Sequence, residues 1–348
     1  MTTVSLAAIG WSAFFQSQLD LSEAALTPAR LSELHRSRLV ALGEQGEMTL
    51  HPPPGAFSAD LAVGDWLLCR EGALVRRLVR RSALIRQAAG SHVAAQAIAA
   101  NVDTIFIVTS CNAEFNERRI ERYLALAAQA GCLPVIVLTK ADLSDDPDRY
   151  RAAAMRLRPG QIVETVDARD WASLAPLLHW CGGGQTVALL GSSGVGKTTL
   201  TNALTGRSDL TAAIREDDAQ GRHTTTFRAL RPMPSGGHVI DTPGMRALRL
   251  TDVAEGIDAT FEEIADLARQ CRFRDCSHGT EPGCAIRAAI DRGDVEEVRL
   301  ESWQKLRAED RRHSETLAEH HARARGFGKL TRRAQRDKAR LRGAGPDD

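Results

Sequence analysis

The 348-residue sequence has few aromatic residues, almost no net charge and no long apolar run. Aromatic side chains make up 5% of the residues, which argues against a module that binds bases mainly by stacking. The formal net charge is +1, so a nucleic-acid surface must come from local clusters of basic residues. No apolar run approaches the about 20 residues that cross a bilayer, so we expect no membrane partner.

The start of the chain, MTTVSLAAIGWSAFF, lacks the basic stretch that opens a secretory signal. Seven cysteines, an odd number, are not the even set of a disulfide-stapled secreted domain. We therefore expect a reduced, cytoplasmic protein. Hydrophobic residues at 43% and charged residues at 26% exclude a mostly disordered or collagen-like chain, and the length favours two or three domains.

Short β-rich runs separated by turns fill residues 37–90, whereas residues 1–36 give no structural prediction. The runs RLVALG, GEMTL, GDWLLCR and ALVRRLV are typical of a small barrel, and an OB-like barrel fits the length. Basic residues follow the last runs; they are Arg76, Arg77, Arg80, Arg81 and Arg86. They indicate either an oligonucleotide surface or a strand edge protected by charge, and the arginines alone favour neither.

Apolar strands alternate with helices over residues 91–250, which predicts a doubly wound parallel sheet. The expected strands are TIFIVTS, PVIVLTKADL, QIVETVDA and TVALLG, and HTTTFRALRPM-PSGG-HVIDTPG predicts a hairpin that turns at SGG. Residues 251–322 are expected to be helical around a loop rich in Cys and His. Residues 323–348 form a basic tail that we expect to be flexible.

The strongest motif directly follows the strand TVALLG. Its residues are Gly191, Ser192, Ser193, Gly194, Val195, Gly196, Lys197 and Thr198. They match G-x-x-x-x-G-K-[ST] between a strand and a helix, where backbone N–H groups cradle phosphates at a helix N-terminus. Lys197 would reach the β- and γ-phosphates, and Thr198, followed by Thr199, would bind Mg²⁺. The alternative is a glycine-rich turn with an incidental lysine, and the flanking strand and helix argue against it.

Three weaker segments gain meaning beside this phosphate loop. Asp241 ends the strand HVI and can hold Mg²⁺ through water, and the N–H of Gly244 can meet a γ-phosphate. Upstream, residues 221–226 include His223 and Thr225 and can order over Mg²⁺ and the γ-phosphate. The alternatives are a common turn for the first segment and a plain loop before a strand for the second.

The third weak segment, Thr139-Lys140-Ala141-Asp142, closes the strand PVIVL. A carboxylate at Asp142 can accept the N1–H and exocyclic amine of guanine, while Lys140 packs along the ring. Alone, this match of four residues is weak.

Three cysteines and one histidine lie close together beyond residue 250. The set Cys271, Cys276, His278 and Cys284 offers thiolate and imidazole ligands for a closed tetrahedral Zn²⁺ site, which is structural rather than catalytic. Chance clustering or a disulfide is the alternative, and the expected reducing compartment argues against it. We expect the remaining cysteines to be ordinary buried thiols.

The order TKAD, GSSGVGKT, GRHTTT and DTPG resembles the motifs of GTPases, with the base-binding segment moved ahead of the phosphate loop. With the barrel and the Cys/His loop, residues 35–310 resemble the circularly permuted, small-ribosomal-subunit-dependent GTPases of bacteria. The resemblance implies a multidomain α/β protein with an OB-like barrel, a permuted P-loop GTPase domain and a helical zinc-binding domain. It also implies GTP and GDP with Mg²⁺, one structural zinc, and a monomer that acts on the small subunit and its rRNA during late assembly or maturation checking.

Two positions depart from this resemblance. The family has Asn where this chain has Thr139, which has no amide to bond both the base and the phosphate loop. Met245 stands after DTPG where Ras-like GTPases carry a water-orienting glutamine. The resemblance makes His223 the candidate to orient or deprotonate water, against a merely structural role. Two other interpretations stay open from sequence: an ATP-using P-loop enzyme such as a small-molecule kinase, and a nucleotide-gated RNA-binding scaffold with negligible turnover.

Overall fold

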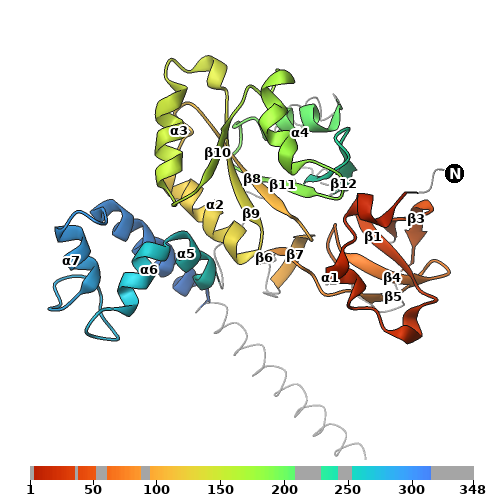
Figure 1. Ribbon diagram of the computed structural model, residues 1–348, viewed down its shortest axis with the longest axis horizontal. Coiled ribbons are helices and arrows are strands. Elements are labelled where there is room, and N and C mark those ends of the chain that lie inside the picture. The colour runs from red at the N-terminus through yellow and green to blue at the C-terminus, as the bar shows by residue number, and fades with distance from the viewer. Residues whose placement is uncertain are drawn as a thin grey trace, which may run out of the picture.

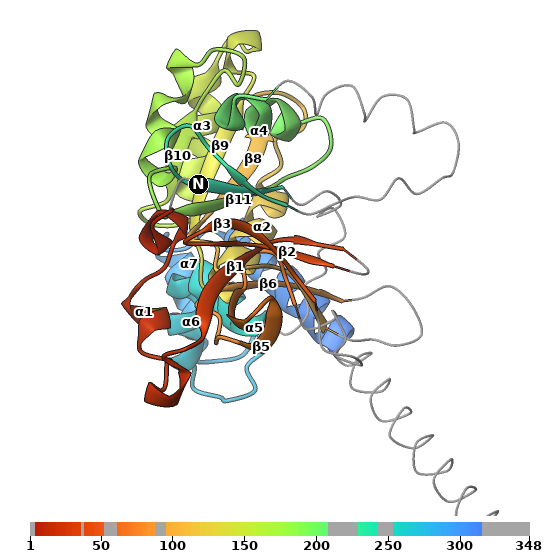
Figure 2. The same ribbon diagram turned by 90° about the vertical axis from the view of Figure 1, so that its right-hand side faces the viewer.

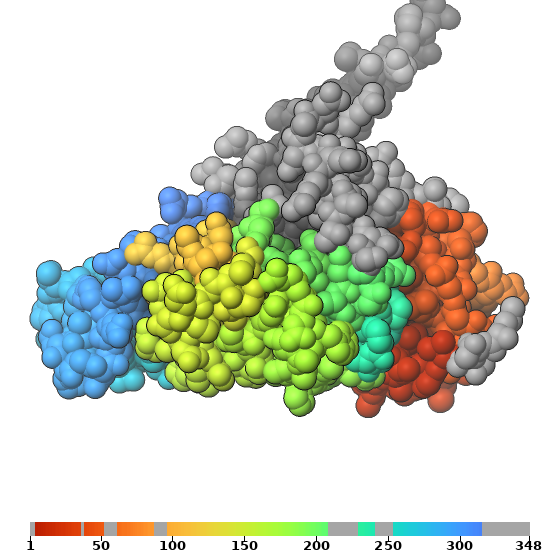
Figure 3. All heavy atoms as spheres, turned by 90° about the horizontal axis from the view of Figure 1, so that it is seen from above, coloured from red at the N-terminus to blue at the C-terminus, as the bar shows by residue number. Residues whose placement is uncertain are grey.

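The protein consists of three regions that lie in a row (Figure 1). A barrel lies at one end, a sheet flanked by helices in the middle, and a group of short helices at the other end. The space-filling view shows the three regions packed against one another (Figure 3). The structure, a computed structural model, describes residues 4–35, 38–51, 61–87, 95–207, 229–241 and 253–314. No helix among these residues is long and apolar enough to span a membrane.

The barrel is antiparallel and OB-like, as the sequence predicted. Its strands are β1 (Thr27–Leu34), β2 (Leu39–Gly43), β3 (Gly46–Leu50), β4 (Trp66–Arg70) and β5 (Ala73–Arg77). β1 pairs with both β2 and β4, while β3 pairs with β2 and β5 pairs with β4. A bridge between His51 and Ala73 joins the ends of β3 and β5, which closes the barrel.

The segment before residue 37, which has no predicted structure, supplies a strand of the barrel. The barrel therefore begins at Thr27 of β1 rather than at residue 37. The pattern of β1 is hard to recognise because Arg30 interrupts its apolar residues, although this side chain is only 1% exposed. Further upstream, η1 (Leu6–Ile9) and α1 (Ala13–Gln16) pack through Ile9 and Phe15 against β4, and η2 (Leu21–Glu23) follows.

The central region is the predicted doubly wound sheet with its hairpin. Its elements are β8 (Thr104–Ser110), α2 (Glu117–Gln129), β9 (Leu133–Thr139), η4 (Ala141–Leu143), α3 (Pro147–Arg156), β10 (Ile162–Thr165), η5 (Ala172–Trp180), β11 (Thr186–Leu190), α4 (Lys197–Thr205), β12 (Ala229–Pro232) and β13 (His238–Asp241). The strands β10, β9, β8, β11 and β13 are parallel in this spatial order, and β12 pairs antiparallel with β13.

The side chains of β8 show the two faces of this sheet. Ile105 and Ile107 point into the core that contains α2 and α3, whereas Phe106 and Val108 point into the core that contains η5 and α4. The chain runs outward from β8 to β10 and returns to β11 on the other side of β8. Ligands bind α/β sheets at such a reversal, outside the carboxyl ends of the strands. The fold thus places the phosphate loop, which follows β11, at the expected edge.

The C-terminal helices are fixed to α2 of the central region. They are α5 (Ala254–Thr260), α6 (Glu262–Arg269), α7 (Ala285–Asp291) and a helix over residues 297–314. An added Cβ on Gly256 would lie 2.2 Å from the carbonyl oxygen of Ala125, so α5 approaches α2 this closely only with glycine. The largely buried side chains of Arg299 and Glu121 form an ion pair at 2.9 Å. Burial nevertheless raises the pKa of Glu121.

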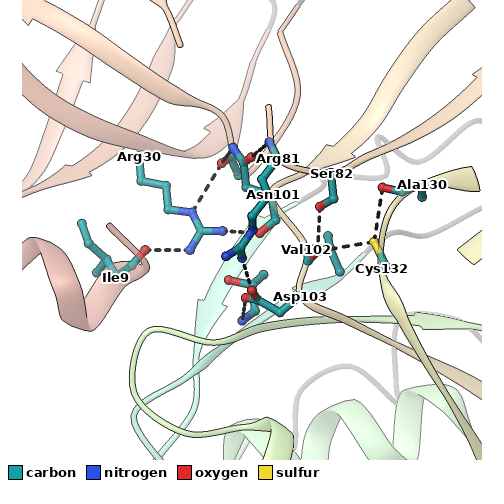
Figure 4. Close-up of polar contacts among 11 residues, drawn as sticks. Ile9, Arg30, Arg81, Ser82, Asn101, Val102, Asp103, Ala130 and Cys132 are labelled. Carbon is teal, nitrogen blue, oxygen red and sulfur yellow. Dashed lines mark hydrogen bonds and ion pairs between the residues drawn. The ribbon is translucent and has the colours of Figure 1, made fainter. Parts of the chain in front are cut away.

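Arg30 joins the N-terminal segment, the barrel and the central region (Figure 4). Its guanidinium donates to the carbonyl oxygens of Ile9 at 2.6 Å, Asn101 at 2.9 Å and Gly64 at 3.4 Å. Burial lowers the pKa of Arg30 to about 10, so it stays charged near neutral pH. Burial, helped by Arg30, also lowers the pKa of His238 to about 4, which keeps that imidazole neutral. The carbonyl oxygens of Ile9 and Asn101 therefore depend on one charged side chain, whereas that of Gly64 also accepts from the side-chain amide of Asn101 at 2.9 Å.

The barrel is further linked to the central sheet through a strand pair. β1 pairs with β12 at Glu33 and Ala229, so one continuous sheet runs from the barrel into the central region. Two more strands, β6 (Ala83–Gln87) and β7 (Ala95–Ala100), form a separate antiparallel pair between the two regions. Seen from the barrel end, the barrel lies in front of the C-terminal helices and the central sheet rises above both (Figure 2).

We expect Arg30→Met to lower the free energy of unfolding by about 3 kcal/mol, because it leaves buried carbonyl oxygens without a donor. Arg70→Met is the matched control: Arg70 is exposed at the end of β4, and its loss should cost less than about 0.5 kcal/mol. Urea unfolding of the full chain measures both. Equal stability of the two variants would contradict the role given to Arg30.

Candidate functional site

The phosphate loop connects β11 to α4, as its motif requires. Gly191 follows β11 with a φ of 155°, and α4 begins at Lys197. An added Cβ on Gly191 would lie 2.2 Å from the carbonyl oxygen of Val108, so the loop passes β8 too closely for a side chain. Gly194 and Gly196 have φ angles of 78° and 93°, in the left-handed region that favours glycine. A loop of this shape can present its N–H groups to an anion at the start of α4.

Residues of types suited to phosphate and magnesium belong to this loop and to the elements beside it. The ammonium group of Lys197 donates to the carbonyl oxygen of Ser192. Thr198 and Thr199 are half-buried in the first turn of α4. Asp241 ends β13, which lies beside β11 in parallel register. A lysine, a hydroxyl and a strand-end carboxylate are the groups that P-loop proteins use for the β- and γ-phosphates and Mg²⁺, so this donor set fits the metal.

Thr139 ties the base-binding segment to the phosphate loop. Its side chain is 1% exposed, and its hydroxyl lies 2.6 Å from the carbonyl oxygen of Val195 and 3.0 Å from that of Thr109. Lys140 adds a second tie, because its ammonium group donates to the carbonyl oxygen of Gly194 at 2.7 Å. The hydroxyl of Thr139 therefore makes the link to the phosphate loop that an asparagine amide is expected to make.

Asp142 has a partner that the sequence did not indicate. Its carboxylate forms an ion pair with Arg169, which also lies 3.4 Å from Asp167. Arg169 follows β10 and thus reaches Asp142 from the neighbouring strand's carboxyl end. In the sequence, the only sign that Arg169 belongs to the site is its position directly after TVDA, residues 165–168. That segment is too degenerate to assign as a nucleotide motif. Arg169 contacts one oxygen of this carboxylate, Oδ2, and would compete with a guanine that bonds both oxygens.

The predicted switch residues His223, Thr225 and Gly244 lie outside the described residues, as does Met245. For Asp241 the structure gives the backbone position at the end of β13. The roles of these residues stay predictions.

Cys271, Cys276, His278 and Cys284 come together as predicted, with all four ligand atoms within 4.8 Å of one another. The Nδ1 atom of His278 lies 3.6 Å from the sulfur of Cys271 and 3.7 Å from that of Cys284. The two sulfurs are 3.9 Å apart. Tetrahedral zinc with its usual bond lengths requires about 3.6 Å between nitrogen and sulfur and about 3.8 Å between sulfurs. The cluster therefore fits one closed zinc site.

Hydrogen bonds and ion pairs of charged side chains stabilise the loop between α6 and α7, which carries these ligands. Glu281 accepts hydrogen bonds from the N–H and hydroxyl of Ser277 and from the N–H of Gly279 at 2.8 Å. These bonds lower the pKa of Glu281 to about 2, so it is a carboxylate near neutral pH. Arg287 donates to the carbonyl oxygen of His278 at 2.7 Å and pairs with Glu297. The loop is thus held between α7 and the helix over 297–314.

The other cysteines are buried thiols, as expected; they are Cys69, Cys111, Cys132 and Cys181. Burial raises the pKa of Cys69 and Cys111 to about 11, and of Cys132 and Cys181 to about 12. These thiols are therefore protonated and unreactive near neutral pH.

The arginines after the barrel runs are mostly engaged within the protein, which neither interpretation of their charge predicted. The ion pairs are Arg76–Glu23 at 2.5 Å, Arg80–Asp65 at 2.7 Å and Arg81–Asp103. The hydrogen bond from Arg76 lowers the pKa of Glu23 to about 2. These pairs hold η2, the barrel and the start of β8 together. These three arginines therefore have a structural role, and their contact with RNA stays a prediction.

Comparison with known proteins points to one family of GTPases. A family model described as RsgA GTPase matches residues 77–251. A Mesorhizobium japonicum protein described as small ribosomal subunit biogenesis GTPase RsgA is 51% identical over 312 residues, which cover 88% of this chain and 90% of that protein. A Vibrio parahaemolyticus protein described as small ribosomal subunit biogenesis GTPase RsgA 2 is 49% identical over 343 residues, which cover 97% and 94%.

Two solved structures share the fold. YjeQ from Thermotoga maritima matches with a TM-score of 0.62 and 24% identity, and covers 81% of this chain and 97% of its own. YloQ, described as a circularly permuted GTPase, matches with a TM-score of 0.61 and 23% identity, and covers 85% and 99%. The predicted permuted architecture is therefore confirmed at the level of the fold.

We expect Asp142→Asn to remove the preference for GTP over ATP, because an amide cannot accept from both guanine donors. Thr139→Val should instead weaken both nucleotides by about tenfold, since it only frees the phosphate loop from β9. Thr139→Ser keeps the hydroxyl and is the control, with affinities near those of the wild type. Competition binding with a fluorescent nucleotide measures all three variants. Loss of guanine preference in Thr139→Val alone would reverse these two assignments.

We expect the purified chain to contain one zinc and Cys276→Ala to lose it. The loop between α6 and α7 is polar, so metal binding would supply much of its stability. Metal analysis and hydrogen exchange over residues 253–314 measure the two effects, with the buried thiol variant Cys181→Ala as a control that keeps its zinc. Cys276→Ala with full zinc content and unchanged exchange would remove the structural role.

Proposed function

The chain belongs to the RsgA GTPase family, and we propose that it hydrolyses GTP to GDP and phosphate during biogenesis of the small ribosomal subunit. The observation that carries this proposal is the phosphate loop at the end of β11 beside Asp142 at the end of β9, tied together by Thr139. The ribosomal part is supported by relatives of similar length whose descriptions name the small subunit. Both GTP hydrolysis and the role in subunit biogenesis require a guanine nucleotide at the carboxyl edge of the central sheet.

The chemistry is attack of water on the γ-phosphate, and the chain's residues bind and orient the reactants. Loop N–H groups and Lys197 would stabilise the charge that builds on the phosphate oxygens. Thr198 and Asp241 would hold Mg²⁺, which would supply positive charge to the phosphates when the nucleotide is bound. His223 is our candidate to orient the water, with Thr225 and the N–H of Gly244 beside the γ-phosphate. The zinc site lies in another region and would stabilise without taking part.

We assign contact with ribosomal RNA to a groove beside the zinc loop. The groove has a volume of about 1340 Å³, and its lining includes Arg272, Phe273, Arg274, Arg307 and Arg311. Arg272, Phe273 and Arg274 are exposed, and the guanidinium of Arg272 lies 5.4 Å from the ring centre of Phe273. Arginines bind phosphates, and an exposed ring with an arginine beside it can stack on an unpaired base. Asp258, Asp275 and Asp310 also line the groove, and Arg307 pairs with Asp258 at 3.4 Å. The exposed Arg272, Phe273 and Arg274 therefore carry this assignment.

The proposed activity implies where and when the protein acts on the small subunit. The protein would act as a monomer in the cytoplasm, where the small subunit matures. GTP would favour binding to the subunit, and hydrolysis would license release after late assembly or a maturation check. The barrel and the zinc-binding region would serve as the two outer contact modules around the GTPase domain.

We expect isolated small subunits to accelerate GTP hydrolysis by at least about tenfold, whereas large subunits should have no effect. Steady-state phosphate release with small subunits, large subunits and neither measures this. No acceleration by small subunits would contradict the ribosomal role while leaving the GTPase assignment in place.

The RNA groove is tested in the same assay. Arg272→Ala with Arg274→Ala should raise the small-subunit concentration needed for half-maximal stimulation and reduce its salt dependence, because phosphate contacts are lost. Arg151→Ala with Arg156→Ala, on the exposed side of α3, is the charge-matched control. Equal behaviour of the two double variants would remove the groove from the interface.

A further inference from the structure

Arg119, in the first turn of α2, contacts the phosphate loop from outside it. The side chain of Asn116 caps α2 by accepting the N–H of Arg119 at 2.9 Å, which fixes the start of the helix. The guanidinium of Arg119 donates to the hydroxyl of Ser192, the second residue of the loop. The acidic group near it, Glu114, lies 3.3 Å away and is half exposed. An exposed pair of this kind contributes little, so Glu114 does not neutralise Arg119 strongly.

Two cationic groups therefore meet at Ser192. The ammonium group of Lys197 lies at its carbonyl oxygen, and the guanidinium of Arg119 lies at its hydroxyl. Lysine at this position of a P-loop reaches the β- and γ-phosphates. The place of Lys197 thus marks the side of the loop that the terminal phosphates occupy, and Arg119 approaches the same residue.

We propose that Arg119 contacts the terminal phosphate of a bound nucleoside triphosphate and makes α2 responsive to its presence. The guanidinium exchanges the neutral hydroxyl of Ser192 for a phosphate oxygen, which is a stronger, charge-assisted partner. Arg119 is 39% exposed on its side chain, so it moves without disturbing the core. The proposal rests on the proposed function only in placing a nucleotide at the phosphate loop.

The turn of α2 after Arg119 holds the C-terminal helices. Glu121 pairs with Arg299 at 2.9 Å, and Arg122 pairs with Glu309 at 2.9 Å. Both partners belong to the helix over residues 297–314, which also borders the zinc loop. A change at Arg119 therefore occurs within one helical turn of the ion pairs that fix this helix. Through them α2 carries the presence of the terminal phosphate to the zinc-binding region.

Binding affinities for GDP and for the β,γ-imido analogue of GTP, with Mg²⁺, test the contact. Arg119→Ala should weaken the analogue by at least about tenfold and change GDP by less than about twofold. Arg119→Lys keeps the charge and should fall between Arg119→Ala and the wild type. Arg118→Ala is the matched control, since Arg118 is the adjacent exposed arginine and pairs with Glu301 at 3.7 Å; it should leave both affinities unchanged.

An equal loss of affinity for both nucleotides in Arg119→Ala would show that Arg119 only supports the phosphate loop. No loss of affinity for either nucleotide would show that Arg119 neither supports the loop nor contacts the phosphate. Each of these results overturns the proposal. Ser192→Ala removes the hydroxyl alone and should preserve the affinity ratio. If the wild type prefers ATP, the GTPase assignment fails, and ADP with the corresponding ATP analogue tests Arg119 in the same way.

Hydrogen exchange over residues 297–314 tests the responsive helix. In the wild type, the amides of residues 297–314 should exchange more slowly with the triphosphate analogue bound than with GDP bound. This difference should vanish in Arg119→Ala, with each nucleotide at a concentration that saturates the protein. A difference that persists in the variant, or that is absent from the wild type, would overturn the role of α2.

Discussion

The nucleotide site depends on the hydrogen bonding of β8 between β9 and β11. Thr139 at the end of β9 pairs opposite Ser110, and Leu190 at the end of β11 pairs opposite Ile107. Because the three strands are parallel, their carboxyl ends bring the base-binding segment and the phosphate loop to one edge of the sheet. Each segment is held by the strand before it, so the order of the segments along the chain can change without changing the site. The hydroxyl of Thr139 then joins the two segments directly.

Both outer regions are attached to elements that border this edge. The C-terminal helices share a hydrophobic core with α2, whose first turn contacts the phosphate loop through Arg119. The barrel is joined through Arg30 and through the pair of Glu33 with Ala229, the first residue described after the predicted switch segment. A GTPase domain with contacts of this kind can move the two regions attached to it when the γ-phosphate leaves.

The parts that could be predicted from sequence are those in which one local pattern determines the outcome. The apolar strands, the glycines of the phosphate loop and the close spacing of Cys271 to Cys284 each carry their own signal. The parts that could not be predicted depend on pairing between distant residues. β1 contains a charged residue, Arg30, that is buried only because carbonyl groups from three segments surround it. Arg76 and Arg169 look like free surface charges in sequence, yet Glu23 and Asp142 engage them.

We propose that a guanine nucleotide binds across β8, from Asp142 to the phosphate loop. A crystal structure of the chain with Mg²⁺ and the β,γ-imido analogue of GTP would show where the base and the phosphates lie. We predict that the carboxylate of Asp142 accepts hydrogen bonds from the guanine N1–H and amine, that Arg169 has left this carboxylate, and that the phosphates lie in the loop from Gly191 to Lys197. A base bound away from Asp142, with the Arg169 ion pair intact, would contradict this placement of the nucleotide.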